Sequence, residues 1–148
     1  RVSVAAQDVH SNYARSGCIE GYLTVTGGST DLDPPELEIV SVTPSTISPG
    51  ETVTVRWRAT DATGLMERGD DYYTFFSLCT PAPGNSYGGL IAYGSLISGS
   101  STDGIWEASH ELLDGFAAGE WRVSVAAKDV NSNYDLSGCI EGYLTVTP

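Results

Sequence analysis

Basic residues are scarce in this chain. Seven lysines and arginines, of which only Lys128 is a lysine, stand against nineteen aspartates and glutamates, and the formal net charge is −12. Nucleic acids and anionic membrane surfaces are bound through clusters of basic side chains. The shortage of such side chains argues against both kinds of partner. It suits a soluble extracellular protein, whose acidic groups serve solubility alone or also hold Ca²⁺.

Long apolar runs are also missing. No stretch approaches the roughly 18 to 20 consecutive apolar residues that a membrane-spanning helix requires, and no signal peptide is present. Both absences are expected of an internal piece of a secreted protein. Apolar residues rarely recur with the 3.6-residue period of a helix, whereas several segments alternate, and Thr, Ser, Val, Gly and Tyr are abundant. This composition predicts an all-β protein.

Catalytic motifs are scarce as well. The sequence contains no HExxH, P-loop or CxxC motif, and residues 84–88 (GNSYG) match GxSxG in their letters alone. His10 lies in a predicted loop and His110 in a predicted strand, and neither has a spacing that suggests a Ser-His-Asp relay. Glu67, Asp70 and Asp71 form an acidic cluster that a solvated loop explains. We therefore expect no enzymatic activity.

The chain does contain a stretch that occurs twice. Residues 1–26 read RVSVAAQDVHSNYARSGCIEGYLTVT, and residues 122–147 read RVSVAAKDVNSNYDLSGCIEGYLTVT. The copies differ at four of their 26 positions, which are Gln7/Lys128, His10/Asn131, Ala14/Asp135 and Arg15/Leu136. Their offset of 121 residues is about the size of one small β-domain. We interpret them as the same part of two successive repeats.

This interpretation predicts the domain organisation. Residues 1–26 are the closing strand pair of a preceding repeat, with strands at 1–7 and 18–26 joined by a polar connection. Residues 27–35 (GGSTDLDPP) form a linker, and residues 36–148 form one complete repeat. The sequence then represents a window of a longer tandem array.

The three cysteines follow the same period. Cys18 and Cys139 occupy one position in the two copies, so a full repeat carries two cysteines. An even number per repeat in an acidic, lysine-poor chain favours an oxidising compartment and a disulfide. Cys79 can pair with Cys139 inside the repeat, or with Cys18, which would join each repeat to its predecessor. Free buried thiols are the alternative to both pairings.

Alternating segments separated by Gly, Pro and Asp predict about seven strands in the complete repeat. The clearest is Thr52–Thr60 (TVTVRWRAT), in which Trp57 is a natural core residue. For residues 105–113 a short helix is the alternative, but Trp106 and Ala108 alternate with polar residues. The remaining predicted strands are 37–42, 72–79, 90–97, 116–130 and 139–147. This number and spacing of strands indicate a β-sandwich.

Two runs carry a resemblance to a known family. Residues 31–65 (DLDPPELEIVSVTPSTISPGETVTVRWRATDATGL) and 101–133 (STDGIWEASHELLDGFAAGEWRVSVAAKDVNSN) resemble the two halves of bacterial Ig-like repeat domains. The resemblance implies an Ig-like antiparallel β-sandwich that occurs in tandem arrays of large secreted or surface proteins, including adhesins. Residues 65–103 and the cysteines depart from the family pattern. So does Ser132, which occupies the glycine position of its Asp-x-x-Gly-Asn ending.

The segment DVNSNYD is a candidate metal site. Oxygen-bearing side chains recur there at every second residue, namely Asp129, Asn131, Asn133 and Asp135. Such alternation can wrap one Ca²⁺, as in the first half of an EF-hand loop. In the predicted sandwich the loop with Asp61 lies at the same end, and the linker brings Asp31 and Asp33. A cation bridging these groups would stiffen the joint between repeats.

Other features of the same segment point to simple turn formation. The glycine and the bidentate glutamate of an EF-hand are missing, and the first copy has His10 and Ala14 in place of two oxygen-bearing residues. Asp and Asn also close turns through their own side chains without any metal. Both interpretations, a Ca²⁺ site and no cofactor, stay open at this point.

Aromatic residues gather in the part of the chain that departs from the family pattern. They are Tyr72, Tyr73, Phe75, Phe76, Tyr87 and Tyr93, and the four tyrosines are the candidate binding residues. An exposed, coplanar subset would stack on sugar rings or on another protein, whereas buried rings would serve the core.

These observations predict a structural and interaction repeat of an extracellular or cell-surface tandem array, such as an adhesin stalk or a filament. Its expected partners are neighbouring repeats, with head-to-tail self-assembly by strand addition as a variant. The alternative is a carbohydrate-binding accessory module of a secreted glycan-active enzyme, for which a glycan or host-surface ligand is expected.

Overall fold

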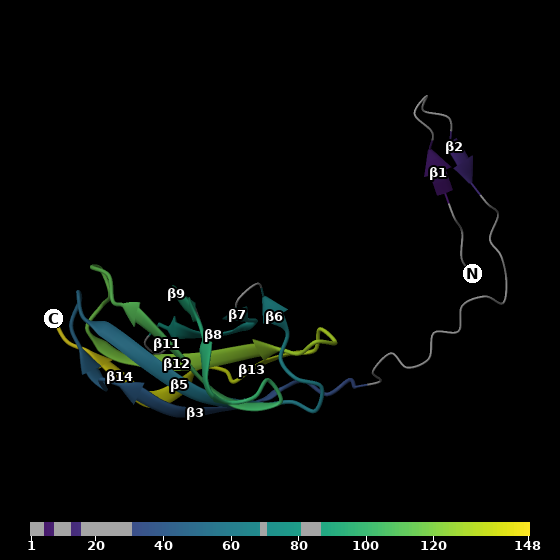
Figure 1. The fold of residues 1–148 in the computed structure, drawn as a ribbon. Coiled ribbons are helices and arrows are strands. Elements are labelled where there is room, and N and C mark those ends of the chain that lie inside the picture. Colours follow the sequence, from purple (N-terminus) through teal and green to yellow (C-terminus); the bar gives the residue numbers. More distant parts are fainter. Residues whose placement is uncertain (1–4, 8–12, 16–30, 69–70, 81–86) are drawn as a thin grey trace. The chain divides into compact units, whose positions relative to one another are not determined.

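The computed structural model describes residues 5–7, 13–15, 31–68, 71–80 and 87–148 (Figure 1). Strands, turns and loops account for these residues, and no helix occurs among them. The predicted all-β class is confirmed. The chain divides into two units, Arg1–Thr30 and Asp31–Pro148.

The first unit contains one short hairpin among its described residues. β1 (Ala5–Gln7) pairs antiparallel with β2 (Tyr13–Arg15), and Ala5 lies opposite Arg15. The partner of β1 therefore begins inside the segment that the sequence indicated to be a polar connection. Residues 18–26, predicted as the partner strand, lie outside the described residues.

Four strands form one sheet of the second unit. They are β3 (Glu36–Thr43), β5 (Thr52–Thr60), β10 (Ser95–Gly99) and β11 (Asp103–Glu111), in the spatial order β10-β11-β5-β3 with antiparallel neighbours. Val53, Val55, Trp57 and Ala59 are buried along β5, as its alternating sequence predicts. β11 confirms the strand, and not the helix, in this part of the chain.

Six strands form the other large sheet. They are β4 (Thr46–Ile47), β14 (Ile140–Val146), β12 (Gly119–Lys128), β8 (Thr74–Cys79) and β9 (Tyr87–Tyr93) in this order, with β13 (Tyr134–Leu136) also paired to β12. β4 and β14 are parallel, and the other neighbours are antiparallel. β6 (Glu67–Arg68) and β7 (Asp71–Tyr72) form a separate pair.

The single strand predicted over residues 90–97 is wrong, because two strands in different sheets share this stretch. β9 ends at Tyr93 and β10 begins at Ser95, so the chain crosses between the sheets at Gly94. A Cβ atom at position 94 would lie 2.5 Å from two ring atoms of Trp57. Only glycine lets the backbone pass this close to the indole. The predicted strand 72–79 is likewise divided, into β7 and β8 at Tyr73.

Both sheets contribute to one hydrophobic core. Its largest fully buried side chains include Trp57, Trp106, Phe76, Leu65, Leu78 and Leu112. The Trp57 and Phe76 rings meet edge to face, with centroids 6.5 Å apart. The Trp57 Nε1–H donates to Thr74 Oγ1 over 2.8 Å, and that hydroxyl donates to the Ala126 carbonyl over 2.8 Å. This relay satisfies the one polar atom of the buried indole.

A disulfide joins two parts of the six-stranded sheet. Cys79, at the end of β8, is bonded to Cys139, just before β14, with a Cα–Cα distance of 6.0 Å. This is the pairing predicted inside the repeat, and the alternative partner, Cys18, lies outside the described residues. The bond joins residues 60 positions apart. A loop of this length corresponds to about 4 kcal/mol of stabilisation in the chain-entropy description of disulfides.

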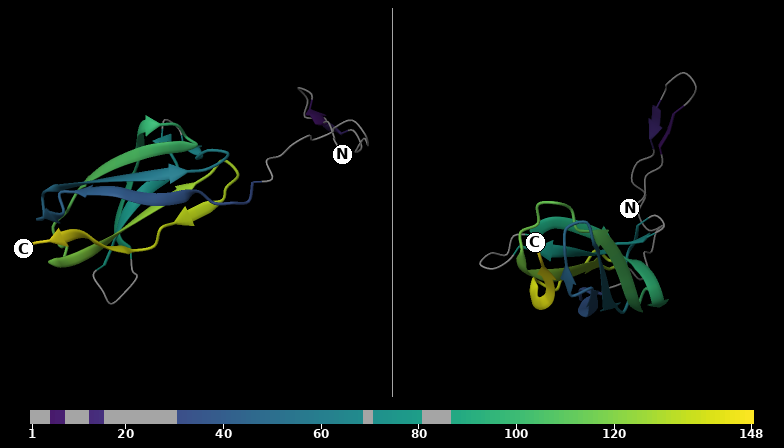
Figure 2. Two further views of the ribbon diagram at one scale, coloured as in Figure 1. Left: turned by 90° about the horizontal axis from the view of Figure 1, so that it is seen from below. Right: turned by 90° about the vertical axis from the view of Figure 1, so that its left-hand side faces the viewer.

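The polypeptide enters and leaves the second unit at opposite ends (Figures 1 and 2). Asp31 contacts Thr63 and Asn133 and therefore lies beside the loops that follow β5 and β12. Thr147 lies at the other end, where its amide donates to the Ile47 carbonyl and its hydroxyl contacts that of Ser48. The two ends are therefore separated by the length of the strands.

Candidate functional site

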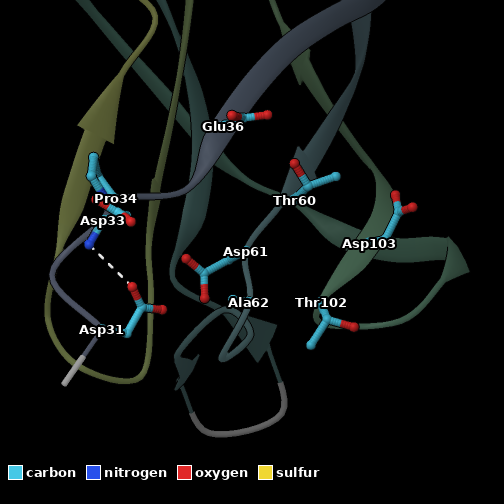
Figure 3. Close-up of a pocket in the computed structure, with 9 residues that line it drawn as sticks. All are labelled: Asp31, Asp33, Pro34, Glu36, Thr60, Asp61, Ala62, Thr102 and Asp103. Carbon is cyan, nitrogen blue, oxygen red and sulfur yellow. Dashed lines mark hydrogen bonds between the residues drawn. The ribbon is translucent and has the colours of Figure 1, made fainter. Parts of the chain in front are cut away.

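Three acidic side chains converge where the chain enters the second unit, at an end that we call the acidic pole. Asp31 precedes β3, Asp61 follows β5, and Asp129 follows β12. One carboxylate oxygen of each lies within 4.8 Å of the others. Asp129 is fully buried, whereas Asp31 and Asp61 are half-buried. Figure 3 shows Asp31 and Asp61 among the residues that line a pocket at this pole.

The loop after β5 is shaped by Asp61. Its Oδ1 accepts hydrogen bonds from the amides of Thr63 (2.8 Å) and Gly64 (2.7 Å) and is 2.8 Å from the Thr63 hydroxyl. A carboxylate that bonds to amides two and three residues ahead closes an Asx turn. Gly64, with a φ of 92°, completes the turn in the left-handed region that glycine adopts without strain.

The loop after β12 is held by Asp129 through bonds to the residue four positions ahead. Its Oδ1 accepts the Asn133 amide (2.7 Å) and its Oδ2 accepts Asn133 Nδ2 (2.7 Å). Ser132, where the Ig-like pattern has glycine, has a φ of 75° and takes the left-handed conformation. The Val130 amide donates to the Gly64 carbonyl and so joins this loop to the preceding one. Turn formation therefore explains part of the Asp/Asn pattern.

The linker is hydrogen-bonded to both loops. Asn133 Nδ2 lies 3.1 Å from the Asp31 carbonyl and 3.4 Å from that of Asp33, and Asp31 Oδ1 accepts the Asp33 amide. The Thr63 hydroxyl lies 3.2 Å from Asp31 Oδ2, accepts a hydrogen bond from Asn131 Nδ2, and has only one proton to give to Asp31 or Asp61. The segment that starts at Asp31 is thus fixed to the two loops.

The acidic pole has the spacing of a single-cation site. Ca²⁺–oxygen distances of about 2.3 to 2.6 Å place oxygens on opposite sides of the ion up to about 5 Å apart. The carboxylates of Asp31, Asp61 and Asp129 fit this limit. Of the other predicted ligands, Asn131 and Asn133 contact the loops by hydrogen bonds, while Asp33 and Asp135 do not belong to the acidic set among the described residues.

Thr63 is the residue of this site that sequence reasoning missed. It contacts Asp31, Asp61 and Asn131 at once. The signal was the short run Asp61-Ala62-Thr63-Gly64, whose composition is typical of an Asx turn.

No protein-family model matches this chain, and no match was found among curated proteins. The duplicated stretch and the acidic pole are therefore the features that bear on its function. The described part of the chain also contains no helix long and apolar enough to cross a membrane.

The candidate aromatic residues form a cluster with its rings tilted against one another. Tyr73, Phe75 and Tyr93 have centroids 5.7 to 6.3 Å apart and interplanar angles of 67° to 74°. Tyr93 is 40% exposed, and Lys128 Nζ lies 5.8 Å from the centroid of the Tyr73 ring. Tyr72 and Tyr87 lie in β7 and β9, and their side chains are outside the described set. The three described rings do not form the coplanar platform expected of a sugar-stacking surface.

Two ion pairs cross the exposed face of the four-stranded sheet. Arg58 binds Asp103 with two parallel bonds of 2.9 and 2.8 Å, and Arg56 Nε lies 2.6 Å from Glu107 Oε2. The hydrogen bond and charge of Arg58 lower the pKa of Asp103 below its ordinary value of 3.8, and Asp103 raises the pKa of Arg58. These pairs depend on the register of β5 and β11, which the sequence pattern alone does not provide.

Proposed function

We propose that this chain is a structural repeat of an extracellular tandem array, of the bacterial Ig-like type, in a stalk, adhesin or filament. The duplicated hairpin carries the proposal. Ala5 lies opposite Arg15 in β1 and β2, and Ala126 lies opposite Leu136 in β12 and β13. The offset of 121 residues maps one pair onto the other, and the next two pairs correspond in the same way. The two copies thus share a local structure as well as a sequence.

The sheet orders support an Ig-like β-sandwich. If β3 is taken as strand A, the four-stranded sheet has the order D-E-B-A and the other has the order A′-G-F-C-C′. Both are orders of immunoglobulin-type sandwiches, and both sheets bury side chains in one core. The disulfide departs from the antibody pattern, since it joins strand C to the segment between F and G.

Opposite entry and exit points suit a linear array. A repeat whose chain enters at the acidic pole and leaves at the far end places its successor beyond it, without a return connection. The disulfide supports an oxidising, extracellular setting. Head-to-tail contacts between neighbouring repeats are the partners we propose. A glycan-binding module is less well supported, because the described tyrosine rings are edge to face.

We also propose a joint-stiffening role for the acidic pole. Three like charges within 4.8 Å repel one another, and a Ca²⁺ between them would convert that repulsion into attraction. Asp31 belongs to the linker segment, while Asp61 and Asp129 belong to the repeat. A shared cation would therefore hold the incoming linker to the repeat.

A two-repeat protein tests the proposed function. Placing residues 27–121 ahead of residue 1 completes the first repeat from its own sequence. We expect two disulfides, each inside one repeat, and two equal unfolding events when the molecule is stretched. Small-angle scattering should give a maximum dimension close to twice that of one repeat. A compact particle, or disulfides that join the two repeats, would contradict the proposal.

A further inference from the structure

The dipeptide Asp–Gly occurs twice in this chain, at Asp103–Gly104 and at Asp114–Gly115. The amide nitrogen of the residue after an aspartate can attack the aspartate side chain and close a succinimide ring. A glycine has no Cβ atom to hinder that attack. The two dipeptides therefore have nearly the same intrinsic reactivity, and a difference between them in the folded protein is due to their surroundings.

Ring closure depends on the freedom of the groups that react. The aspartate side chain must turn toward the following amide, and that amide must leave any hydrogen bond it makes. The backbone must also rotate about the bond between the aspartate Cα and its carbonyl carbon. An exposed turn allows these movements at little cost, whereas a paired strand must first open.

The first dipeptide is held at the start of β11. Both carboxylate oxygens of Asp103 are bonded to the Arg58 guanidinium, and the Asp103 carbonyl accepts the Ser100 amide over 2.9 Å. That carbonyl and the Gly104 nitrogen belong to one planar peptide group, so both are fixed together. Gly104 is buried and is paired with residues of β10 and of β5. Ring closure here would disrupt the ion pair and the strand pairing at once.

The second dipeptide lies in the loop that joins β11 to β12. Asp114 and Gly115 are both exposed, and Gly115 has a φ of 101°, which glycine adopts without strain. Within the described part of the chain, neither the Asp114 carboxylate nor the Gly115 amide has a hydrogen-bond or ion-pair partner. The reacting groups of this dipeptide are therefore free to approach each other.

The space around the two glycines differs in the same sense. A Cβ atom at position 104 would lie 2.5 Å from Leu96 Cδ1 and from the Ser100 carbonyl oxygen. A Cβ atom at position 115 would have no atom within 4 Å outside its chain neighbours. The backbone can thus rotate at Gly115 without a collision, whereas Gly104 is enclosed.

The loop is fixed on either side of the second dipeptide. Leu112 is fully buried, and its amide donates to the Glu51 carbonyl over 2.8 Å. On the other side, the Ala117 carbonyl accepts the Trp121 Nε1–H over 2.8 Å. The segment between these two anchors can rearrange while the core stays closed. Reaction at this dipeptide therefore does not require unfolding.

We propose that Asp114–Gly115 is a modification site, at which aspartate converts spontaneously to isoaspartate in the folded protein while Asp103–Gly104 stays unchanged. The inference does not depend on the proposed function, because it concerns one loop of the second unit. The product keeps the charge of aspartate but continues the backbone through the side-chain carbon, which lengthens the loop by a methylene group. Its free α-carboxylate is the group that isoaspartate methyltransferases esterify.

The conversion needs water alone. With the Asp114 carboxyl group protonated by solvent, the Gly115 nitrogen attacks Cγ, and the N–Cγ bond forms. The Cγ–O bond breaks, and the hydroxyl group leaves with the amide proton as water. A second water molecule then opens the ring. Attack at the backbone carbonyl carbon breaks its bond to nitrogen and gives isoaspartate, whereas attack at Cγ restores aspartate.

Ageing the full chain in H₂¹⁸O tests the proposal. The folded protein is kept at about pH 6, where a small fraction of an ordinary aspartate carries a proton. Cleavage after Glu107 and Glu111 then places the two dipeptides in different peptides. Each passage through the ring adds an ¹⁸O atom, and electron-transfer fragmentation distinguishes isoaspartate from aspartate. We expect ¹⁸O-labelled isoaspartate at Asp114 at about tenfold or more the level at Asp103, where the strand must open first.

An unfolded sample and a matched variant complete the experiment. In guanidinium chloride with a reductant, both dipeptides should react at similar rates, because only the fold distinguishes them. Asp114→Glu keeps the charge but requires a larger ring that closes far more slowly, so it should remove the signal at this position. Equal isoaspartate at both positions of the folded protein would overturn the proposal. So would its absence at Asp114 after a time in which the unfolded chain has reacted.

Discussion

Single hydroxyl and carboxylate groups determine several features of the second unit. Thr74 satisfies the buried indole of Trp57 and the carbonyl of Ala126 through one oxygen atom. Asp61 and Asp129 each close a turn before any question of metal binding arises. Such polar atoms are costly when they lose their partners, because burial prevents water from replacing them.

Replacing Thr74 by valine should therefore be strongly destabilising. Thr74→Val keeps the shape of the side chain but leaves Trp57 Nε1 without its acceptor, and we expect a loss of about 1 to 3 kcal/mol in the free energy of unfolding. Thr74→Ser, which keeps the hydroxyl, is the matched control and should lose less. Urea denaturation measures both variants. Equal losses would show that the hydroxyl relay contributes nothing.

Asp103 should titrate below its ordinary range. Because Arg58 lowers the pKa of Asp103 in the folded protein, the folded state binds fewer protons than the unfolded state between the two pKa values. The contribution of this ion pair is fully present above the unfolded value near 3.8 and is lost as the pH falls through the folded value. An NMR titration of the Asp103 carboxyl group measures the shift. Arg58→Gln should move the pKa of Asp103 back toward 3.8, and an unchanged pKa would contradict the assignment.

At the scale of elements, the sequence pattern was informative where a strand buries one face. The alternation of Thr52–Thr60 predicted β5 and its buried residues, and the alternation around Trp106 distinguished a strand from a helix. The pattern was uninformative where one strand follows another directly, with no turn between them. Residues 90–97 contain no proline or Asx punctuation, and the change of sheet at Gly94 depends on the position of Trp57, which lies far away in the sequence.

The candidate site was likewise predictable from the sequence only in part. The sequence indicated that Asp31, Asp61 and Asp129 share one end of a sandwich, because loop order follows from strand order. It did not indicate that Asn133 donates to the linker carbonyls or that Thr63 lies among the acidic groups. Those contacts depend on the turn geometry of two loops at once, which no single segment encodes.

The crossing at Gly94 should tolerate no side chain. Gly94→Ala places a methyl group against Trp57 and also 3.2 Å from the Trp106 Cβ, and overpacking of this kind costs about 1 to 3 kcal/mol. A double-mutant cycle with Trp57→Leu identifies the cause, since the smaller side chain makes room for the methyl group. We expect Gly94→Ala to cost less in that background. An equal cost in both backgrounds would place the strain elsewhere.

At the scale of the whole molecule, the two ends of the second unit differ in chemistry. The entry end carries the three converging carboxylates, and the exit end carries the parallel β4–β14 pair and the C-terminal residues. Stiffness of an array would depend on how firmly each linker is held at the entry end. Hydrogen bonds from Asn133 and Thr63 provide part of that hold.

Ca²⁺ bound at the acidic pole should strengthen the attachment of the linker segment. Extracellular Ca²⁺ sites often bind in the 0.1 to 1 mM range, so 10 mM Ca²⁺ should raise the free energy of unfolding by about 1 to 3 kcal/mol. Asp61→Asn keeps the oxygen that closes the turn but removes one charge, and it should reduce this increment. Asp114→Asn, at an exposed position outside the acidic set, is the matched control. Thermal unfolding with Ca²⁺ and with Mg²⁺ measures the stabilisation by each ion. An equal stabilisation by both ions would contradict a calcium site.

Each core residue within residues 122–147 has an identical counterpart in residues 1–26, and this identity has a consequence at the level of the gene. In the proposed tandem array, a genetic crossover at any point within the two 26-residue stretches would keep every residue that residues 122–147 contribute to the core. The product would gain or lose one whole repeat, and each remaining repeat would still contain all of its strands. Such an array would change its length in steps of 121 residues without loss of the ability of each repeat to fold.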